Sequence, residues 1–316
     1  MSQLNETQQI TDTLMMIRPV AFHRNEQTAV NNYYQKTLEG LSQEEIQANA
    51  LKEFDTFAEK LRAEGVDVVV FDDTAEPATP DSIFPNNWVS FHETGEVILY
   101  PMYAENRRLE RRDDIIEKLG ETFRITRISG FLDWEVKGKF LEGTGSLILD
   151  RPNKIAYAAT SERTNVQVLA DFTEQTGYEI IAFQANQTVN GDRLPIYHTN
   201  VMMCVGEGFA LICDESIDSD MEKKQVMHAF ENTKKEVIFI TEEQKERFAG
   251  NMLQVKNKNG DKYVVMSESA YLALDDDQRE RLSKHGKLLH SSLDTIECLG
   301  GGSARCMMAE VFLPRK

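Results

Sequence analysis

The sequence predicts an α/β fold in which one unit, ordered strand, strand, helix, strand, occurs five times in a ring around a central site. Two observations support this prediction: the unit recurs along the chain, and its fifth copy is divided between the two ends, so the terminal strands are expected to pair. The 316 residues, 41% of them hydrophobic, can bury a large core. No Pro/Gly/Ser-rich linker or charge block interrupts them, so we predict one domain over residues 1–316.

The first two copies show the unit most clearly. In each copy two short apolar strands flank a turn, an amphipathic helix follows, and another apolar strand completes the unit. Gly177 marks the end of the second helix, because glycine is favoured just after a helix C-terminus. The predicted elements are residues 87–92, 95–101, 105–120 and 123–128 in the first copy, and 145–150, 154–160, 162–177 and 178–183 in the second.

The remaining copies follow the same order, and the last one is split. Its first strand covers residues 307–312 at the C-terminus, and its second covers residues 13–20 near the N-terminus. Its helix falls within residues 26–64, and residues 66–71 complete it. A plain α/β sandwich with accidentally similar strand spacing is the alternative. The third and fourth copies comprise residues 201–205, 208–213, 219–233 and 236–240, and residues 252–255, 262–266, 269–285 and 286–291.

Several segments fall outside the repeated elements. Residues 1–11 are polar and are expected to form a flexible tail, and residues 72–85 are the most loop-like part of the chain. Residues 186–195 precede His198 and are a candidate lid, with an ordinary loop as the alternative. The acidic helix around residues 41–54 is expected to present a solvated face.

The charge of the chain favours a small-molecule partner. A net charge of -17 and a pI near 4.9 exclude nucleic acid and anionic membrane as partners, because both would repel the chain. The N-terminus has no basic and apolar leader, and no apolar run reaches the roughly 18 residues of a membrane span, so we expect a cytoplasmic protein. Four cysteines in so long a chain fit reduced thiols, and their spacing predicts no metal site. We expect no cofactor, and a homo-oligomer is left open.

Residues that precede the first strand of each copy bear catalytically useful groups. Equivalent positions in a ring converge on its axis, so these residues are expected to meet at one mouth. They are Asn86 and Asn87, Glu142, His198, Asn251 and Cys306, at nearly equal spacing.

Cys306, His198 and Glu142 form the predicted catalytic set. Three glycines at 300–302 let the backbone approach a ligand closely just before Cys306, whose thiol is a nucleophile when the thiolate is favoured. His198 suits proton transfer near neutrality. Glu142 is expected to orient the imidazole and keep it charged, or to hold a cationic substrate nitrogen. Each residue alone also has a structural interpretation, as a buried small hydrophobe, a core histidine or an acceptor in a turn.

Four motifs in order resemble those of a known family. They are LEGTGSLIL at 141–149, TSERTN at 160–165, YHTNVMMCV at 197–205 and GGGSARCMM at 300–308. The chain resembles the guanidine-modifying enzymes of the pentein fold, which include arginine deiminase, dimethylarginine dimethylaminohydrolase and glycine amidinotransferase. Its closest likeness is to the bacterial group called citrulline utilization hydrolase.

The resemblance implies a pentein α/β-propeller with Cys306 as nucleophile, His198 as general acid and base, and Glu142 as the carboxylate beside it. It also implies that Arg163 clamps the substrate α-carboxylate, since a guanidinium holds a carboxylate in a planar fork. Further basic candidates are Arg18 and Arg305.

Departures from the family pattern bear on the substrate. Asp81 is kept, while Asn86 and Asn87 stand where dimethylarginine hydrolases have an acidic pair, and Asn200 replaces an aspartate of arginine deiminases. A guanidinium stays charged, and burying it without opposing charge is costly, whereas a ureido group is neutral. The amides therefore favour a citrulline-like ureide over arginine. The substrate-binding residues expected are Asp81, Asn86, Asn87, Arg163, Asn200 and Ser303.

The sequence thus predicts a cysteine-dependent hydrolase of a non-peptide C–N bond. It would release ornithine, ammonia and carbon dioxide from citrulline or a similar ureido amino acid through an S-carbamoyl enzyme. The alternatives are a deiminase or dihydrolase of arginine or an N-substituted arginine, an amidinotransferase, and a sensor that binds an amino acid without turnover.

Overall fold

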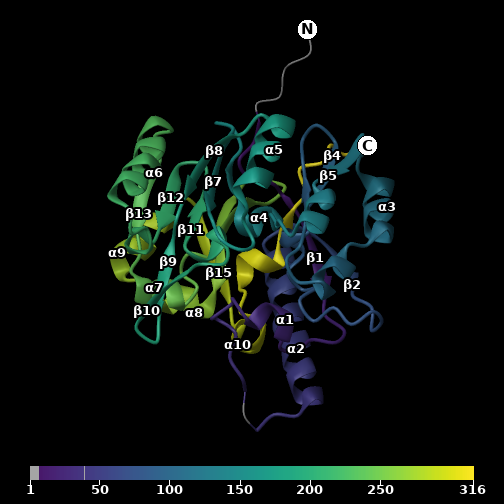
Figure 1. Ribbon diagram of the computed structural model, residues 1–316. Coiled ribbons are helices and arrows are strands. Elements are labelled where there is room, and N and C mark those ends of the chain that lie inside the picture. The colour runs from purple at the N-terminus through teal and green to yellow at the C-terminus, as the bar shows by residue number, and fades with distance from the viewer. Residues whose placement is uncertain (1–6, 39) are drawn as a thin grey trace.

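The computed structural model describes residues 7–38 and 40–316 as an α/β fold with small sheets (Figure 1). Over these residues, five three-stranded sheets share one pattern. The first strand pairs antiparallel with the second, and the second pairs parallel with the third. The sheets are β3-β4-β5 (Val89–Phe91, Glu96–Leu99, Arg127–Gly130), β6-β7-β8 (Ile148–Asp150, Ile155–Ala159, Glu179–Phe183), β11-β12-β13 (Met203–Val205, Phe209–Ile212, Glu236–Phe239), β14-β15-β16 (Leu253–Lys256, Lys262–Ser267, Lys287–Ser291) and β17-β1-β2 (Ala309–Glu310, Thr13–Arg18, Asp67–Asp72).

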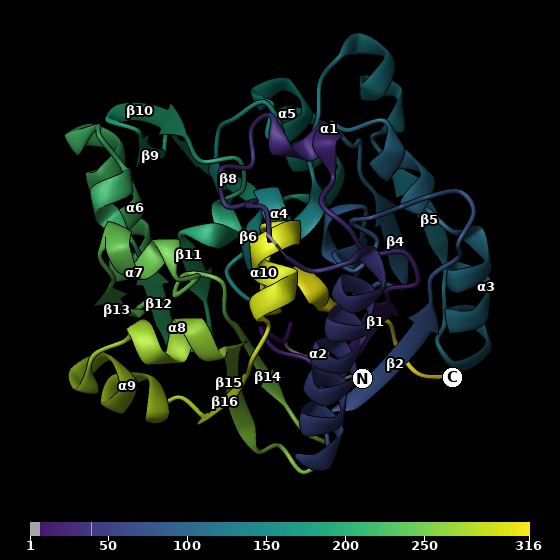
Figure 2. The same ribbon diagram turned by 90° about the horizontal axis from the view of Figure 1, so that it is seen from below.

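Helices connect the second and third strands of the sheets, because a parallel pair needs a crossover connection. Figure 2 shows α3, α5, α6 and α9 toward the outside of the molecule and α4 and α10 near its middle. The described helices are α1 (Glu26–Ala29), α2 (Gln43–Ala63), α3 (Asp113–Thr122), α4 (Gly143–Ser146), α5 (Val166–Thr176), α6 (Asp220–Asn232), α7 (Glu242–Glu246), α8 (Glu268–Ala273), α9 (Asp276–Ser283) and α10 (Asp294–Gly300), with 3₁₀ turns η1 (Pro85–Asn87), η2 (Asn106–Glu110), η3 (Leu132–Lys137), η4 (Thr199–Val201), η5 (Asp214–Ser216) and η6 (Ala304–Met307).

The helix α5 shows how the local sequence defines these elements. The Asn165 side chain accepts from a backbone N–H of the first turn, and Gly177 ends the helix with a left-handed φ of 72°. Val168, Leu169 and Phe172 lie on one face of the helix and are buried in the core.

The two ends of the chain pair as the split fifth copy predicts. In β1 and β17, Leu14 is opposite Glu310 and Met15 is opposite Ala309 in an antiparallel ladder. β1 also pairs in parallel with β2 along its whole length. The predicted pairing of the terminal strands is therefore confirmed.

Two predicted helices are broken. Residues 105–120 form η2 and then α3, with extended backbone at Arg111 and Arg112 between them. The break turns Arg107 and Glu110 inward, where both are buried. Residues 269–285 form α8 and α9.

The break between α8 and α9 has a signal in the sequence. Asp275 accepts from the backbone of Gln278, and the Gln278 side chain accepts from the backbone of Asp275. This capping box starts a new helix. Leu274, just before it, is extended and buried.

The expected tail over residues 1–11 is wrong for its second half, and residues 1–6 lie outside the described residues. Gln9, Ile10 and Thr11 are buried. The Gln9 amide donates to the carbonyl oxygens of Leu149 (2.9 Å) and Val205 (3.1 Å). These hydrogen bonds attach the segment to β6 and β11.

The two segments predicted as loops have different structures. Residues 186–195 form a hairpin of β9 (Asn186–Val189) and β10 (Asp192–Pro195) rather than an irregular loop. Residues 73–84 contain no helix or strand, as predicted.

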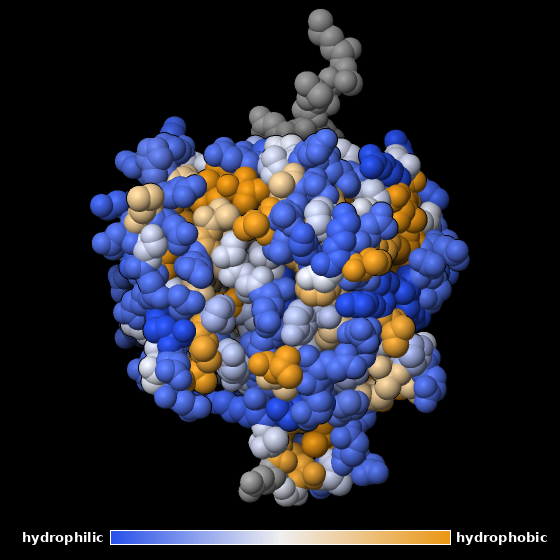
Figure 3. All heavy atoms as spheres, viewed as in Figure 1, coloured by the Kyte–Doolittle hydropathy of each residue, from blue (hydrophilic) through white to orange (hydrophobic). Residues whose placement is uncertain are grey.

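The visible surface is mostly hydrophilic, with scattered apolar side chains (Figure 3). This distribution agrees with the high content of charged residues, 28%. Over the described ranges, none of the helices is both long enough and apolar enough to cross a bilayer.

Candidate active site

Short helical turns at the starts of several sheets bring the predicted catalytic residues together. Glu142 and His198 directly precede α4 and η4, and Cys306 lies in η6. The turn η1 contacts both α4 and η6, and α4 also contacts η4. Equivalent positions of the repeat therefore meet at one place in the fold.

The Cys306 thiol lies between two amide side chains. Its Sγ accepts hydrogen bonds from Asn200 Nδ2 (3.3 Å) and Asn251 Nδ2 (3.2 Å), and the residue is 3% exposed. The backbone N–H of Arg305 donates to Asn251 Oδ1 (2.9 Å), which fixes the orientation of that amide. Two amide N–H groups are therefore directed at the sulfur of the predicted nucleophile. Asn251 was not among the expected substrate-binding residues, although it occupies the equivalent position of the fourth copy.

His198 and Glu142 form a buried hydrogen-bonded pair. His198 Nε2 lies 2.7 Å from Glu142 Oε2, and both side chains are almost fully buried. The other Glu142 oxygen accepts from the backbone N–H of Tyr103 (2.9 Å). These contacts fit the predicted role of Glu142 in orienting the imidazole, which stays a prediction.

The charges of this pair differ from the expectation. Burial alone raises the pKa of Glu142, but the charges of Arg163 and Arg107 and the hydrogen bond from His198 lower it to about 2. Burial lowers the pKa of His198 to about 4, although Glu142 opposes this shift. The pKa of His198 is thus lowered by burial, whereas the sequence predicts that Glu142 keeps the imidazole charged. Near neutral pH the ring donates from Nε2 to Glu142, and Nδ1 is free to accept a proton.

Two glycines of the predicted LEGTG motif leave room for this arrangement. A Cβ at Gly145 would lie 2.4 Å from Asn87 Nδ2 and 2.9 Å from His198 Nδ1. A Cβ at Gly143 would lie 2.3 Å from the carbonyl oxygen of Asn86, and its φ of 45° is left-handed. The turn α4 can approach η1 and His198 only without these side chains.

A small cavity connects the catalytic groups. Its free space is about 10 Å³, room for roughly one water molecule. A second cavity of about 140 Å³ adjoins it and shares the side chains of Arg163 and Tyr197. The first is lined by Asn32, Asp81, Phe84, Asn87, Arg107, Arg163, Tyr197, His198, Gly300, Gly301, Gly302 and Cys306.

Arg163 lies at the junction of these two cavities and is 2% exposed. Its Nε donates to Asn31 Oδ1 (3.0 Å), and its Nη2 donates to the same oxygen and to the Thr28 carbonyl oxygen (3.0 Å). Its Nη1 is 3.5 Å from Glu142 Oε2. One edge of the guanidinium is therefore bound within the protein.

Arg107 is a buried cation of the site that sequence reasoning missed. Its Nη1 donates to Asn87 Oδ1 (2.8 Å), while Nε and Nη2 bind both oxygens of Glu110 (2.8 and 2.9 Å). The segment reads as an exposed helix rich in arginine and glutamate. The Arg107 and Glu110 pair, three residues apart, is the only local signal.

The other expected residues divide into two groups. Asp81 accepts from Asn25 Nδ2 (2.8 Å) and Thr28 Oγ1 (3.0 Å) at the edge of the cavity, and Ser303 donates to Glu297 (2.5 Å) beside the nucleophile's turn. The basic candidates Arg18 and Arg305 are wrong. Arg18 pairs with Asp55 near the surface and Arg305 with Glu310, and neither lines the catalytic cavity.

Four buried polar atoms here have no hydrogen-bond partner among the described residues. They include both kinds of group: Asn87 Nδ2 is a donor, and the others are acceptors. Buried polar atoms are normally paired, and two of these residues, Asp81 and Asn87, line the catalytic cavity. The four atoms are Asp81 Oδ1, Asn86 Oδ1, Asn87 Nδ2 and Asn200 Oδ1.

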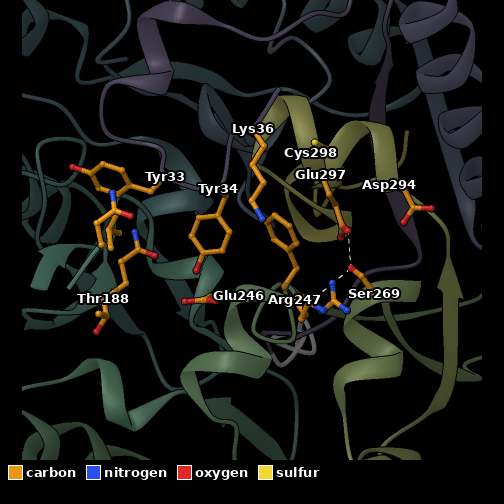
Figure 4. Close-up of a pocket in the computed structure, with 14 residues that line it drawn as sticks. Tyr33, Tyr34, Lys36, Thr188, Glu246, Arg247, Ser269, Asp294, Glu297 and Cys298 are labelled. Atoms are coloured by element: carbon orange, nitrogen blue, oxygen red, sulfur yellow. Dashed lines mark hydrogen bonds between the residues drawn. The ribbon is translucent and has the colours of Figure 1, made fainter. Parts of the chain in front are cut away.

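A larger cavity of about 530 Å³ lies elsewhere in the fold, and Figure 4 shows the residues that line it. It is lined in part by Tyr33, Tyr34 and Lys36 and by the β9–β10 hairpin, and it does not include Cys306, His198 or Glu142. The small cavity is the better candidate for the active site, because Cys306 and His198 line it. The role of the hairpin as a lid stays a prediction.

Comparisons with known proteins relate the chain to one family and one fold. A family model described as "N,N dimethylarginine dimethylhydrolase, eukaryotic" matches residues 18–313. A comparison with curated proteins gave no match.

Solved structures of similar fold include those of two enzymes. ArgZ, described as an arginine dihydrolase from the ornithine-ammonia cycle in cyanobacteria, has a TM-score of 0.73 and 17% identity over 96% of this chain and 41% of its own. The substrate-bound N-terminal domain of ArgZ gives the same score and identity over 98% of its length. A dimethylarginine dimethylaminohydrolase variant with an S-methyl-L-thiocitrulline adduct has a TM-score of 0.63 and 16% identity over 95% of this chain and 99% of its own. The chain thus spans about two fifths of full-length ArgZ.

Proposed function

The chain belongs to the N,N dimethylarginine dimethylhydrolase family, and on this premise we propose that it hydrolyses a citrulline-like ureido amino acid. The family confirms the predicted pentein superfamily and the predicted class of enzyme, a hydrolase of C–N bonds other than peptide bonds. The finer placement in the citrulline utilization hydrolase group is part of the proposal. So is closure of the five sheets into a propeller around Cys306.

The proposal depends on one observation, the set of unpaired polar atoms around Cys306. A ureido group has one carbonyl acceptor and several N–H donors, whereas a guanidinium has donors only. Asn87 Nδ2 can donate to the ureido oxygen, and Asp81 Oδ1 and Asn200 Oδ1 can accept from its nitrogens. A guanidinium would leave Asn87 Nδ2 facing another donor, which is costly in a buried site.

The buried charges of the site are paired with one another. Arg107 and Arg163 are buried cations, and the carboxylates of Asp81, Glu110 and Glu142 lie against them. A neutral ureide adds no charge, so the existing pairs can stay intact.

In the proposed first step, Cys306 Sγ attacks the ureido carbon and His198 Nδ1 takes the thiol proton. The bond from that carbon to the side-chain nitrogen breaks, and His198 passes the proton to this nitrogen, so ornithine leaves. Glu142 stabilises the imidazolium that forms for part of the cycle. Asn200 and Asn251 stabilise the sulfur before attack.

In the second step, water attacks the S-carbamoyl enzyme. His198 accepts a proton from the water and returns it to sulfur, and the carbamic acid released decomposes to ammonia and carbon dioxide. One water is consumed overall for each citrulline. We further propose that Nη1 of Arg163, the edge not bound to Asn31, contacts the substrate α-carboxylate at the junction of the two cavities.

Dihydrolysis of arginine is the second candidate. Asp81 Oδ1 is a carboxylate oxygen without a partner among the described residues, and a guanidinium could bind there. The fold is also that of ArgZ, described as an arginine dihydrolase.

The proposal is tested by incubating the purified protein with citrulline, arginine and asymmetric dimethylarginine in parallel and identifying the amino-acid products. We expect ornithine and ammonia from citrulline and none from Cys306→Ala. Faster ornithine release from arginine would support the second candidate. Citrulline as the end product from arginine would indicate a deiminase, and binding without turnover would indicate a sensor.

A further inference from the structure

Glu297 connects the helix α10 to the turn that holds Cys306. It is 7% exposed, and one carboxyl oxygen accepts from Ser303 Oγ at 2.5 Å. The carbonyl oxygen of Ser303 in turn accepts from the backbone N–H of Cys306 at 2.9 Å. Two hydrogen bonds therefore lead from Glu297 to the nucleophile.

The second carboxyl oxygen of Glu297 faces away from the catalytic cavity. It accepts from Ser269 Oγ at 2.6 Å on the wall of the larger cavity, as the dashed line in Figure 4 shows. No salt bridge to Glu297 is formed by any Lys, Arg or His of residues 7–38 and 40–316. The two serine hydroxyls thus hold the carboxyl group from opposite sides.

The chain between α10 and Ser303 has no side chains of its own. It consists of two glycines, Gly301 and Gly302, which follow Gly300 at the end of α10, and Gly301 adopts a left-handed φ of 62°. A Cβ at Gly302 would lie 2.9 Å from the Phe84 ring, and one at Gly301 would lie 2.6 Å from the Asn32 side chain. The close packing requires glycine here, and glycine leaves the backbone free to adopt other conformations. Asn32, Gln35 and Tyr197 donate hydrogen bonds to the carbonyl oxygens of Gly300 and Gly301. Ser303 is the first residue after this stretch whose own side chain anchors the turn η6.

We propose that Glu297 is a positioning residue that holds the turn η6 through Ser303 and so places Cys306 Sγ between Asn200 and Asn251. The inference rests on the proposed function only in taking Cys306 as the nucleophile. It assigns Ser303 to the support of this turn rather than to the substrate. Loss of the anchor should lower kcat more than it changes KM, because the substrate contacts proposed above lie on other residues.

The anchor does not require a negative charge. Burial raises the pKa of Glu297 to about 7, so a large share of the carboxyl group is protonated near neutrality. Glutamine keeps both hydrogen bonds: its oxygen accepts from Ser303, and its amide donates to Ser269. Glu297→Gln is therefore the conservative variant that should rescue function, and Glu297→Leu removes both hydrogen bonds at similar volume.

The test measures kcat, KM and the rate at which iodoacetamide alkylates Cys306, followed by peptide mass spectrometry. All variants are made with Cys298→Ser, because Cys298 lines the larger cavity and is partly exposed. Asp294→Asn is the matched control, since it changes a charge on the same helix and in the same cavity but bonds only Ser292. Ser303→Ala removes the hydrogen bond between Ser303 and Glu297 by changing its other partner. It replaces Glu297→Leu in the test if that variant does not fold.

We expect Glu297→Leu to lower kcat by about 10- to 100-fold, as small displacements of a reacting group do, with KM changed less than about threefold. The Cys306 alkylation rate should change severalfold. Adding Ser303→Ala to Glu297→Leu should lower kcat little further, because both variants remove the same hydrogen bond. Glu297→Gln and Asp294→Asn should stay close to the parent in all three readouts. A folded Glu297→Leu variant with unchanged kcat and an unchanged alkylation rate would overturn the proposal. An equal fall of kcat in Glu297→Gln and Glu297→Leu would overturn it too. Alkylation is measured without substrate, so it tests the anchor even if no ureide is turned over.

Discussion

Gly145→Ala is the smallest substitution that should disable the site without removing a functional group. Gly145 lies in α4, between Asn87 of η1 and His198 at the start of η4. No left-handed φ is involved at this position, so the effect of alanine is steric. The methyl group would contact the proposed ureide donor and the proposed base at once.

The displacement can be worked from the structure. Ordinary contact begins at about 3.4 Å, and the new Cβ would lie 2.4 Å from Asn87 Nδ2 and 2.9 Å from His198 Nδ1. The amide must therefore move by about 1.0 Å and the imidazole by about 0.5 Å. Neither is free to move, because Arg107 holds Asn87 Oδ1 at 2.8 Å and Glu142 holds His198 Nε2 at 2.7 Å. A misplacement of about 1 Å costs about 100-fold in rate, and overpacking costs about 1–3 kcal/mol of stability.

The assay compares kcat for ornithine release with the free energy of unfolding from urea denaturation. Gly120→Ala is the control, because it lies in α3 and its Cβ would meet only Ile125 Cδ1 at 3.7 Å. Alanine should stabilise that helix by about 0.5–1 kcal/mol and leave kcat unchanged. If Gly145→Ala kept the wild-type kcat, the close packing of Asn87 and His198 around α4 would not be what positions them.

Three further results are expected. Asn87→Asp replaces the unpaired donor by a carboxylate oxygen, so kcat/KM for citrulline should fall by about tenfold or more relative to that for arginine; an unchanged ratio would argue against the amide as the ureide donor. Glu142→Gln removes the charge that supports the imidazolium of His198 and should lower kcat by about 10²- to 10⁴-fold, with a kcat near that of the wild type as the contrary result. Because burial raises the pKa of Glu297 to about 7, the folded protein loses stability as pH rises from the unfolded value near 4.5 through 7. Glu297→Gln lacks this loss, so urea denaturation should show its stability relative to wild type rising between pH 5 and pH 8, and equal differences at the two pH values would refute the buried carboxyl as the cause.

The repeated order of elements could be predicted from the sequence because each copy shows the same order of strands and helix. Short apolar strands and glycine-ended helices are local signals, and their recurrence fixed the pairing of β1 with β17 without any information on contacts. Helix boundaries were less accessible. The break at Asp275 has a capping box that the sequence displays, but the break after Glu110 depends on burial of Arg107, which is a tertiary effect.

The candidate site was predictable where position in the repeat decides it. Glu142, His198 and Cys306 precede equivalent strands, and the structure brings their turns together. Asn251 also precedes the first strand of its copy but was not predicted as a site residue, because an amide side chain suggests no reaction by itself.

Arg107 and the charge state of His198 were beyond sequence reasoning. An arginine among many charged residues reads as solvated, and only the fold shows that it faces Asn87. The low pKa of His198 comes from burial, which overrides the carboxylate that the sequence places beside it.

The central claim is that Cys306 attacks a ureido carbon. The most direct test is to mix the protein with citrulline, quench with acid during turnover, and identify the adduct on the Cys306 peptide by mass spectrometry. We expect one carbamoyl group on Cys306, absent from Cys306→Ala. An amidino adduct formed from arginine, with no carbamoyl adduct formed from citrulline, would contradict it.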